Sequence, residues 1–423
     1  MFIFRVNKIT STMNCAQICG TKNLHTGSRG SPFTSRSARI VTSLIRTSDL
    51  HNTAIQRSSY IKFLGFGRFA VGLFLALLST CFLSSVYARP KPAASGYHLI
   101  KTISVPPAPG GGEYYDYIVI DPETRRVYVS HGTEVVVLNA DNYSVVGKVE
   151  GMTRSHGIAL VKEVGKGFIT DGDSRPDAKI QQVVIFDLKT LKVTGEVATD
   201  QPDTDAIIYE PVTKHIFTFN GDSHNATVID PVKQAVITNI DLVGEVEFPA
   251  VDGKGMVYDN NPGKSEVVAI DARTNKVKAR WPTAREGHPV SMAMDQKNRR
   301  LFSAGRGPQF VTMMDAETGK VLQSYPISAG VDANSFDPVT GMLFVSTRER
   351  MMHIYREDSP DTLSEVETVK TQYGAKTLQV DPKTHNVFLS TSDFNPPAAP
   401  TEKQPHPPAT PKPGNFRVLV YGR

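Results

Sequence analysis

Short runs of β-branched and aromatic residues alternate with turn residues along most of the chain. The clearest example is Asp121–Val149, DPETRRVYVSHGTEVVVLNADNYSVVGKV. It contains three apolar runs, Val127–Ser130, Val135–Leu138 and Val145–Val149, which are separated by the turn sequences HGTE and NADN. Apolar runs of this length, bounded by Gly, Asn and Asp, predict short β-strands joined by tight turns.

The same pattern returns at intervals of roughly 40–47 residues, which is the spacing of blades in a β-propeller. The expected blades are Tyr115–Glu150, His156–Ala198, Asp205–Leu242, Glu247–Pro282, His288–Ile327, Asp332–Val369 and Lys376–Gly422. Asp-Pro-x-Thr recurs between the first and second strands, and Asp-x-x-Thr-x-x-Val recurs between the third and fourth. A β-sandwich would explain any one hairpin, but seven repeats in register predict an all-β, seven-bladed propeller of four-stranded blades.

The last of these blades provides only three strands of its own, at Thr377–Val380, Asn386–Leu389 and Phe416–Tyr421. Tyr97–Val105, YHLIKTISV, has the pattern of a strand but no partner near it in the sequence. We therefore expect it to pair as the outer strand of the last blade, which would close the ring without an exposed edge. The proline-rich segment 395–414 is expected to remain outside the sheet as a polyproline-type loop.

An uncharged apolar run, Phe69–Leu83, precedes the repeats. Basic residues come before it, and the small residues Val86 and Ala88 come after it. This order is that of a secretory signal peptide, so residues 57–88 would be removed and residues 89–423 would form the mature propeller. An uncleaved membrane anchor is the alternative, but the run is short against the ~20 residues that a spanning helix needs.

Charge and cysteine are concentrated in this leader. The formal net charge of the whole chain is +5, but residues 1–88 hold ten Lys/Arg and one acid. The remainder carries a net charge of −4, which argues against a nucleic-acid surface. All three cysteines precede Ala88, so the mature chain would have no disulfide; this favours a periplasmic or secreted protein of the bacterial envelope. Residues 1–56 have no hydrophobic periodicity, and we expect a disordered extension there. They are either an organelle transit peptide or, as we prefer, a stretch upstream of the true start.

The repeated sequences Asp-Pro-x-Thr-x-x-Val-Tyr/Phe-Val-Ser and VVxIDxxTxxV resemble those of the YVTN-repeat, YncE-like family of exported bacterial β-propellers. The resemblance covers nearly all of residues 89–423. The YVTN tetrad itself is only approximated, by VYVS, FVST and FLST, and the family's Asn-Thr-Val-Ser-Val-Ile-Asp strand is present only as NATVID at Asn225–Asp230. The resemblance implies the fold and export, but it implies little about activity because propellers host many functions.

Candidate chemistry lies where the innermost strand of each blade begins, five residues before each first turn. The residues at this position are Asp116, His156, Asp205, Glu247, Val290, Asp332 and Lys376. His288 lies two residues from the one apolar exception. Ionisable side chains avoid burial unless they are paired or bound to metal, so the set predicts a polar channel mouth.

Two interpretations of this ring remain open. The simpler one is a water-filled channel whose charges pair with one another. In the other, the ring binds a small polar ligand with Lys376 as counter-charge, or Asp116, Asp205, Glu247 and Asp332 bind Ca²⁺ or Mg²⁺ through oxygen atoms. Loops after the second strands open on the same face, and they offer His131, Asp171, Asp173, Asp222, Arg306 and Arg348, for which solvated turn residues are the alternative.

The mature sequence lacks a Gly-x-Ser-x-Gly elbow, a Walker loop, an HExxH motif and cysteine. We therefore expect a monomeric, exported binding or scaffold protein without a membrane span in the mature chain. Its partner would be a small ligand or an envelope protein, bound at the top face and channel mouth. The alternative is a metal-dependent hydrolase or lyase of the lactonase kind, with His156, His288 and Glu247 as the acid–base candidates.

Overall fold

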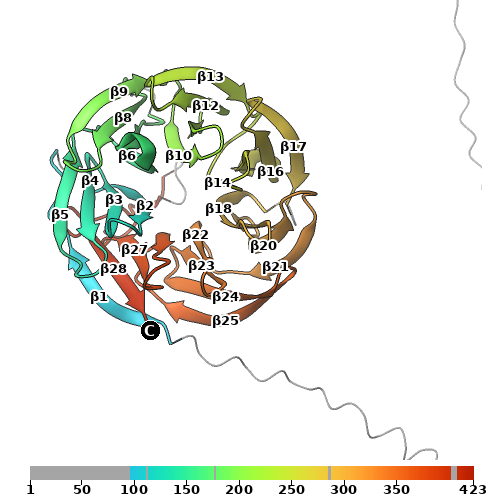
Figure 1. Cartoon of the computed structure of the whole chain (residues 1–423). Helices are drawn as coiled ribbons and strands as arrows, with labels where there is room; N and C mark the ends of the chain where they lie inside the picture. The colour runs from blue at the N-terminus through green and yellow to red at the C-terminus, as the bar shows by residue number, and fades with distance from the viewer. Residues whose placement is uncertain (1–95, 111–112, 176–177, 284–286, 402–406) are drawn as a thin grey trace, which may run out of the picture. The chain divides into compact units, whose positions relative to one another are not determined.

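The computed structural model describes residues 96–110, 113–175, 178–283, 287–401 and 407–423. These residues belong to one compact unit and form seven four-stranded antiparallel sheets around a ring (Figure 1). The predicted all-β, seven-bladed propeller is therefore confirmed. The expected extension 1–56 and signal peptide 57–88 lie outside the described residues. Within the described ranges, no helix is long and apolar enough to cross a bilayer.

The first four blades follow one another along the chain. Blade one contains β2 (Tyr115–Asp121), β3 (Arg126–His131), β4 (Glu134–Asn139) and β5 (Val145–Glu150). Blade two contains β6 (Ser155–Val161), the 3₁₀ turn η1 (Lys162–Val164), β7 (Lys166–Asp171), β8 (Gln182–Asp187) and β9 (Val193–Ala198). Blade three contains β10 (Thr204–Glu210), β11 (His215–Asn220), β12 (Asn225–Asp230) and β13 (Ala235–Asp241). Blade four contains β14 (Pro249–Val251), β15 (Met256–Asn261), η2 (Pro262–Lys264), β16 (Glu266–Asp271) and β17 (Lys276–Pro282).

The remaining three blades complete the ring. Blade five contains β18 (Pro289–Asp295), β19 (Arg300–Arg306), β20 (Gln309–Asp315) and β21 (Val321–Pro326). Blade six contains β22 (Val331–Asp337), β23 (Met342–Thr347), β24 (Met351–Ser359) and β25 (Thr362–Lys370). Blade seven contains β26 (Thr377–Val380), β27 (Val387–Thr391), β28 (Arg417–Gly422) and β1 (His98–Ser104).

Local hydrogen bonds explain why the turn sequence repeats. In the first turn of blade one, Asp121 accepts hydrogen bonds from the Glu123 backbone N–H (3.1 Å) and the Thr124 hydroxyl (2.6 Å). The next residue, Arg125, has a left-handed φ of 60°, which lets the chain enter the second strand. The equivalent acids accept from the backbone two residues later in the same way, at Glu210, Asp295, Asp337 and Asp381. In these blades the turn therefore fixes the register of the inner hairpin without help from distant residues.

Apolar side chains on alternate strand positions pack between neighbouring blades. Tyr128 and Val137 of blade one, for example, are buried against Ile158 and Phe186 of blade two. The six other clusters of the described core also combine side chains from two or more blades. Each sheet therefore needs its neighbours for stability, because a lone four-stranded blade would leave both of its apolar faces in water.

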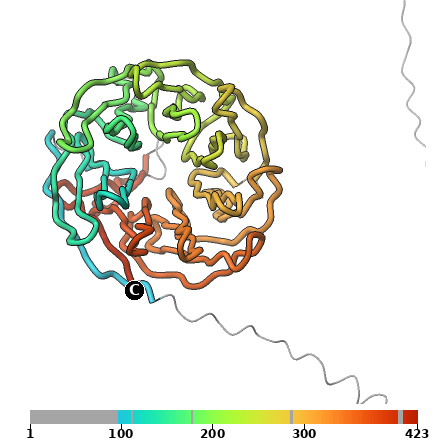
Figure 2. The backbone as a smooth tube through the Cα atoms, in the orientation of Figure 1, coloured from blue at the N-terminus to red at the C-terminus, as the bar shows by residue number. Residues whose placement is uncertain are grey.

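The ring is closed by the strand that precedes blade one. β1 pairs antiparallel with β28, from His98 opposite Gly422 to Ser104 opposite Arg417, so the two ends of the ring lie side by side (Figure 2). The predicted closure by Tyr97–Val105 is confirmed.

Ion pairs connect the first turns of successive blades. Arg125 of blade one lies with its Nη2 atom 2.6 Å from Oδ2 of Asp381 in blade seven, so this pair spans the closing seam. The other pairs of this kind are Lys162–Asp121, Arg299–Asp252 and His385–Asp337. In each pair the basic residue belongs to one blade and the acid to the blade before it. These contacts add polar links between blades to the apolar packing.

The described parts of the proline-rich segment, 395–401 and 407–414, lie outside the seven sheets. A single bridge between Phe394 and Pro411 and a hydrogen bond from the Asn395 N–H to the Thr410 carbonyl (2.8 Å) hold its two ends together. The segment therefore leaves blade seven between β27 and β28 and returns to it at the same point.

Glu357 gives the propeller a pH-dependent contact between blades five and six. Its burial and the neighbouring carboxyl of Asp295 raise the pKa of Glu357 from 4.5 to about 7. Since the pKa of Glu357 in the folded state lies above its ordinary value, protonated Glu357 contributes to the stability of the fold. This contribution is fully present below pH 4.5 and is lost as the pH rises through 7. We expect Glu357→Gln to raise the melting temperature at pH 8 and to leave it unchanged at pH 4.5, measured by circular dichroism. An equal effect at both pH values would contradict this assignment.

Candidate functional site

Four of the polar residues at the channel mouth lie on irregularities of the innermost strands, whereas Glu247 and Lys376 lie just before β14 and β26. The pairing of β2 with β3 skips Asp116, that of β6 with β7 skips His156, and that of β10 with β11 skips Asp205. Asp332 is skipped in the same way in β22. A bulged residue leaves the hydrogen-bond ladder, and its side chain can be directed away from the sheet. Figure 1 shows the innermost strands around the centre of the ring. The side chains of Asp116, Asp205 and Asp332 line one cavity there.

A cavity of about 150 Å³ occupies this mouth, and we call it the cup. It is lined by Tyr114, Asp116, Tyr117, Asp205, Glu247, Phe248, Arg306, Asp332, Lys376 and Thr377. Five of the seven predicted channel-mouth residues therefore line one cavity, and Arg306 from the predicted loop set joins them. His156 lies directly beside the cup, whereas His288 is exposed and does not line it.

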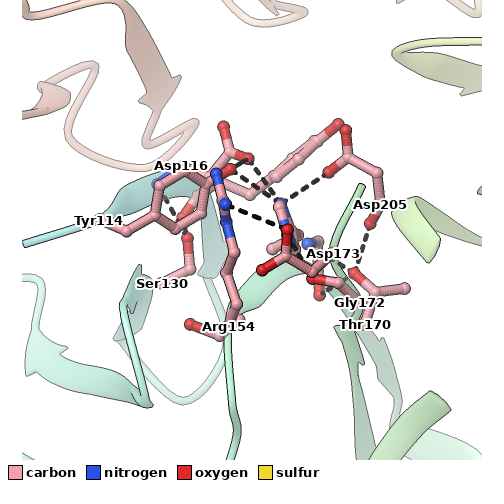
Figure 3. A network of polar contacts seen from close by, with 12 residues as sticks. Tyr114, Asp116, Ser130, Arg154, Thr170, Gly172, Asp173 and Asp205 are labelled. Atoms are coloured by element: carbon pink, nitrogen blue, oxygen red, sulfur yellow. Dashed lines mark hydrogen bonds and ion pairs between the residues drawn. The ribbon is translucent and has the colours of Figure 1, made fainter. Parts of the chain in front are cut away.

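A network of polar contacts borders the cup, and Figure 3 shows Asp116 and Asp205 within it. His156 contacts both of these carboxylates. Its Nδ1 atom is 3.0 Å from Asp116 Oδ2 and 3.0 Å from Asp205 Oδ1. Its Nε2 atom lies 3.1 Å from the carbonyl oxygen of Gly172. Because a carbonyl only accepts hydrogen bonds, Nε2 carries a proton and donates it. The ring is thus oriented with Nδ1 facing both carboxylates.

The charges of this network depend on one another. Burial alone would lower the pKa of His156, but the carboxylates of Asp205 and Asp116 outweigh it and raise the pKa to about 10. Burial would likewise raise the pKa of Asp116, but Lys376 and His156 hold it below its ordinary value. The raised pKa favours the protonated, positively charged form of the His156 ring between Asp116 and Asp205.

The opposite side of the cup carries a second set of charges. Asp332 forms ion pairs with both Arg306 and Lys376, and the Lys376 ammonium also lies 3.5 Å from Asp116. Burial raises the pKa of Glu247 well above its ordinary value. The charge of Arg306 acts against this increase, whereas nearby acids, among them Asp205, raise the pKa further. This shift of the pKa favours the protonated form of the Glu247 carboxyl group.

Of the predicted loop residues, His131 lies away from the channel. Its ring is fully buried and stacks on Phe416 with the ring centroids 4.1 Å apart, and its Nε2 atom lies 3.0 Å from Glu113. The stacking of His131 on Phe416 joins blade one to blade seven. His131 is thus positioned as part of the closing seam.

The other loop residues divide between turns and the surface. Asp171 accepts hydrogen bonds from the backbone N–H groups of Thr153 and Arg154. Asp173 pairs with Arg154 and Arg175. Asp222 and Arg348 are exposed and half-buried, respectively, and neither lines the cup.

Two aromatic residues of the cup, Tyr117 and Phe248, were not predicted, although the sequence repeats could have identified them. Tyr117 of blade one and Phe248 of blade four stack across the channel, with centroids 4.9 Å apart and an interplanar angle of 25°. Both come one position after the ring of charges, where the other blades have small residues: Gly157, Ala206, Ser291, Ala333 and Thr377. Comparing the blades at the position one residue after the ring of charges would have identified these two large residues.

Tyr114 and Arg154 lie outside the repeat positions, and no pattern marks them. The Tyr114 hydroxyl donates to Asp116 Oδ2 at 2.6 Å. The Arg154 guanidinium lies 3.9 Å from the centre of the Tyr114 ring, which is a cation–π contact. Together they cover the His156 side of the cup.

Comparison with known proteins places the fold and no more. No protein-family model and no curated protein sequence matches this chain. Among solved structures, it is similar to "Kuenenia stuttgartiensis Hydrazine Synthase", with a TM-score of 0.54 and 14% sequence identity over 67% of this chain and 93% of that one. At this identity the likeness is one of fold alone.

Proposed function

We propose that this protein is an exported propeller of the YVTN type that binds a divalent cation at its channel mouth. The observation that supports this most strongly is the convergence of one nitrogen and two carboxylate oxygens. Ligand atoms of Asp116, His156 and Asp205 lie within 4.8 Å of one another. Binding would replace the proton on His156 Nδ1 with a metal ion.

The orientation of His156 supports this site. Because Nε2 donates to the Gly172 carbonyl, a neutral His156 ring presents its free electron pair at Nδ1, between the two carboxylates. Histidine ligands of metal sites are commonly fixed in this way through their other nitrogen. One imidazole and two carboxylates suit Zn²⁺ or Mn²⁺ better than Ca²⁺ or Mg²⁺, whose protein ligands are nearly all oxygen atoms.

The size of the cup supports a small ligand. At about 150 Å³ it is below the range of about 300–1,000 Å³ typical of sites for organic ligands. Three protein ligands would leave coordination positions open on the ion, and Arg306 and Lys376 border the same cavity. A small anion or a polar molecule bound to the ion is therefore the ligand that this cup favours.

The export part of the proposal rests on the leader sequence and on the repeats. The apolar run Phe69–Leu83 with small residues at Val86 and Ala88 supports cleavage after Ala88. The intact mass of the protein recovered from the cell envelope would then correspond to a chain that begins at Arg89. A recovered chain that still contains the apolar run would contradict cleavage.

We expect Zn²⁺ or Mn²⁺ to raise the melting temperature of residues 89–423 and EDTA to reverse the shift. At a concentration of 100 times the dissociation constant, the gain in folding free energy is about 2.7 kcal/mol. Asp205→Asn should abolish the shift because it removes one ligand. Differential scanning calorimetry measures the melting temperature of the wild-type protein and of the variant, with and without metal.

The matched control is Asp332→Asn. Asp332 lines the same cup, but it is held by Arg306 and Lys376 and is not one of the three converging ligands. This variant should keep the metal-dependent shift. Loss of the shift in both variants, or its absence from the wild-type protein, would count against the site.

Glu247 favours a metal-dependent hydrolase as the second candidate. Glu247 lines the same cavity as Asp116 and Asp205, and its raised pKa suits a group that donates a proton to a leaving group. The zinc-loaded protein would then hydrolyse members of a lactone and ester panel, and Glu247→Gln would abolish the turnover. No turnover by the wild-type protein across the panel would end this candidate.

A further inference from the structure

The channel continues beyond the cup into a second, apolar space. A cavity of about 310 Å³ is lined by blades one to four, and one of about 230 Å³ by blades three to six, with Gln379 of blade seven lining both. They share Ile208, Phe248, Pro249 and Gln379, so they adjoin. We call the two together the lower chamber.

The stacked rings of Tyr117 and Phe248 separate the two spaces. Both residues line the cup and the 310 Å³ cavity, so the pair forms the floor of one and the roof of the other. Charged side chains lie above the rings. Below them the inner strands present mainly aliphatic and aromatic side chains, such as Leu160, Met294 and Phe336.

The polar groups of the lower chamber are largely occupied by the protein itself. Asp121 and Lys162 form an ion pair at 2.7 Å. Gln379 donates to the Ser335 hydroxyl at 3.1 Å, and Gln296 donates to a backbone carbonyl at 2.8 Å. A charged ligand would therefore find no free counter-charge among the described lining residues.

Two buried polar atoms of the lining are exceptions: the Tyr209 hydroxyl in the 310 Å³ cavity, which has no hydrogen-bond partner, and an acceptor of Asn334. Asn334 lines the 230 Å³ cavity and is 3% exposed. Its amide nitrogen donates to the Phe302 carbonyl at 2.8 Å, whereas its Oδ1 atom has no hydrogen-bond partner. A buried acceptor left without a partner costs about 1–3 kcal/mol, so a ligand that donates a hydrogen bond there would gain affinity.

We propose that the lower chamber binds an uncharged, largely apolar small molecule that carries one hydroxyl or N–H donor, which reaches Asn334. The 310 Å³ cavity lies within the range of about 300–1,000 Å³ typical of small-molecule sites, and the adjoining 230 Å³ cavity extends it. Most of the side chains that line the two cavities are aliphatic or aromatic, which favours a largely apolar molecule. This site is independent of the cation in the cup, because the two share only the aromatic floor.

The test uses 2-naphthol as the probe, with naphthalene and 2-naphthoate as its matched partners. All three have the same ring system, but only 2-naphthol is both uncharged and a hydrogen-bond donor. We expect saturable one-to-one binding of 2-naphthol to residues 89–423 by fluorescence titration. Naphthalene should bind about tenfold more weakly, and 2-naphthoate should not bind. Equal binding of the three probes, or no saturable binding of 2-naphthol, overturns the proposal.

Two variants locate the site. Ile208→Trp fills the junction of the two cavities and should weaken 2-naphthol binding about tenfold or more, whereas Val232→Trp adds the same ring at an exposed position and should not. Asn334→Leu should make 2-naphthol and naphthalene bind equally. Circular dichroism checks the fold, and if Ile208→Trp does not fold, the Asn334 comparison decides. Unchanged discrimination in Asn334→Leu would overturn the proposed contact.

Discussion

Asp116→Ala is expected to lower the free energy of unfolding by about 3 kcal/mol and to abolish the metal-dependent rise in melting temperature. Asp116 is 8% exposed and contacts Tyr114, His156 and Lys376. Its removal leaves the buried His156 and the partly buried Lys376 each with one fewer partner. A buried charge that loses its partner costs far more than a surface ion pair is worth. Urea unfolding at pH 7 measures the change.

Two further variants separate this cause from a general loss of packing. Asp222→Ala removes an exposed acid and should change the stability by less than about 0.5 kcal/mol. The double variant Asp116→Ala with Lys376→Met also removes one of the two cations that lost a partner. It should therefore be more stable than Asp116→Ala alone. A single Asp116→Ala variant within about 1 kcal/mol of the wild-type protein would mean that the charges of the cup are solvated.

Tyr97→Ala is expected to cost about 4 kcal/mol, because Tyr97 anchors the strand that closes the ring. Its side chain is 4% exposed and packs edge-to-face on Phe344 of blade six, with the centroids 5.1 Å apart. Its hydroxyl donates to the His385 carbonyl at 2.8 Å. Tyr97, which directly precedes β1, thus contacts blades six and seven. Loss of the anchor would expose the edge of β28, so faster proteolysis should accompany the loss of stability.

Variants of the same segment distinguish the anchor from the strand in general. Tyr97→Phe removes only the hydroxyl and should cost about 1 kcal/mol. Leu99→Ala changes a side chain of β1 that is 47% exposed and should have little effect. If Tyr97→Ala and Leu99→Ala had equal effects on urea unfolding, the anchor would not lie at Tyr97.

The fold could be predicted because its repeating unit is specified locally. The acid at position 121 and the Thr at position 124 make their hydrogen bonds within one turn, and the turn then sets the register of the strands on both sides. The closing strand was predictable for a different reason. Blade seven lacked a strand and Tyr97–Val105 lacked a partner, so the pairing was the one that left no edge.

The site could be predicted only in part. Counting from the turns identified Asp116, Asp205 and Lys376, because equivalent strand positions face the same channel. The count could not show which of them pair, since His156 meets Asp116 and Asp205 across three blades through side-chain geometry alone. It also could not separate residues of the cup from those of the seams: His288 and His131 have the same chemistry as His156, but the backbone directs them elsewhere.

The central claim is that Asp116, His156 and Asp205 together bind a divalent cation. Crystals of residues 89–423 soaked in Zn²⁺ and measured at the zinc absorption edge test it most directly. We predict one strong anomalous peak in the channel mouth, about 2.0–2.2 Å from His156 Nδ1 and from one oxygen of each carboxylate. An anomalous map with no peak there, or with peaks only at surface histidines such as His98 or His288, would contradict the claim.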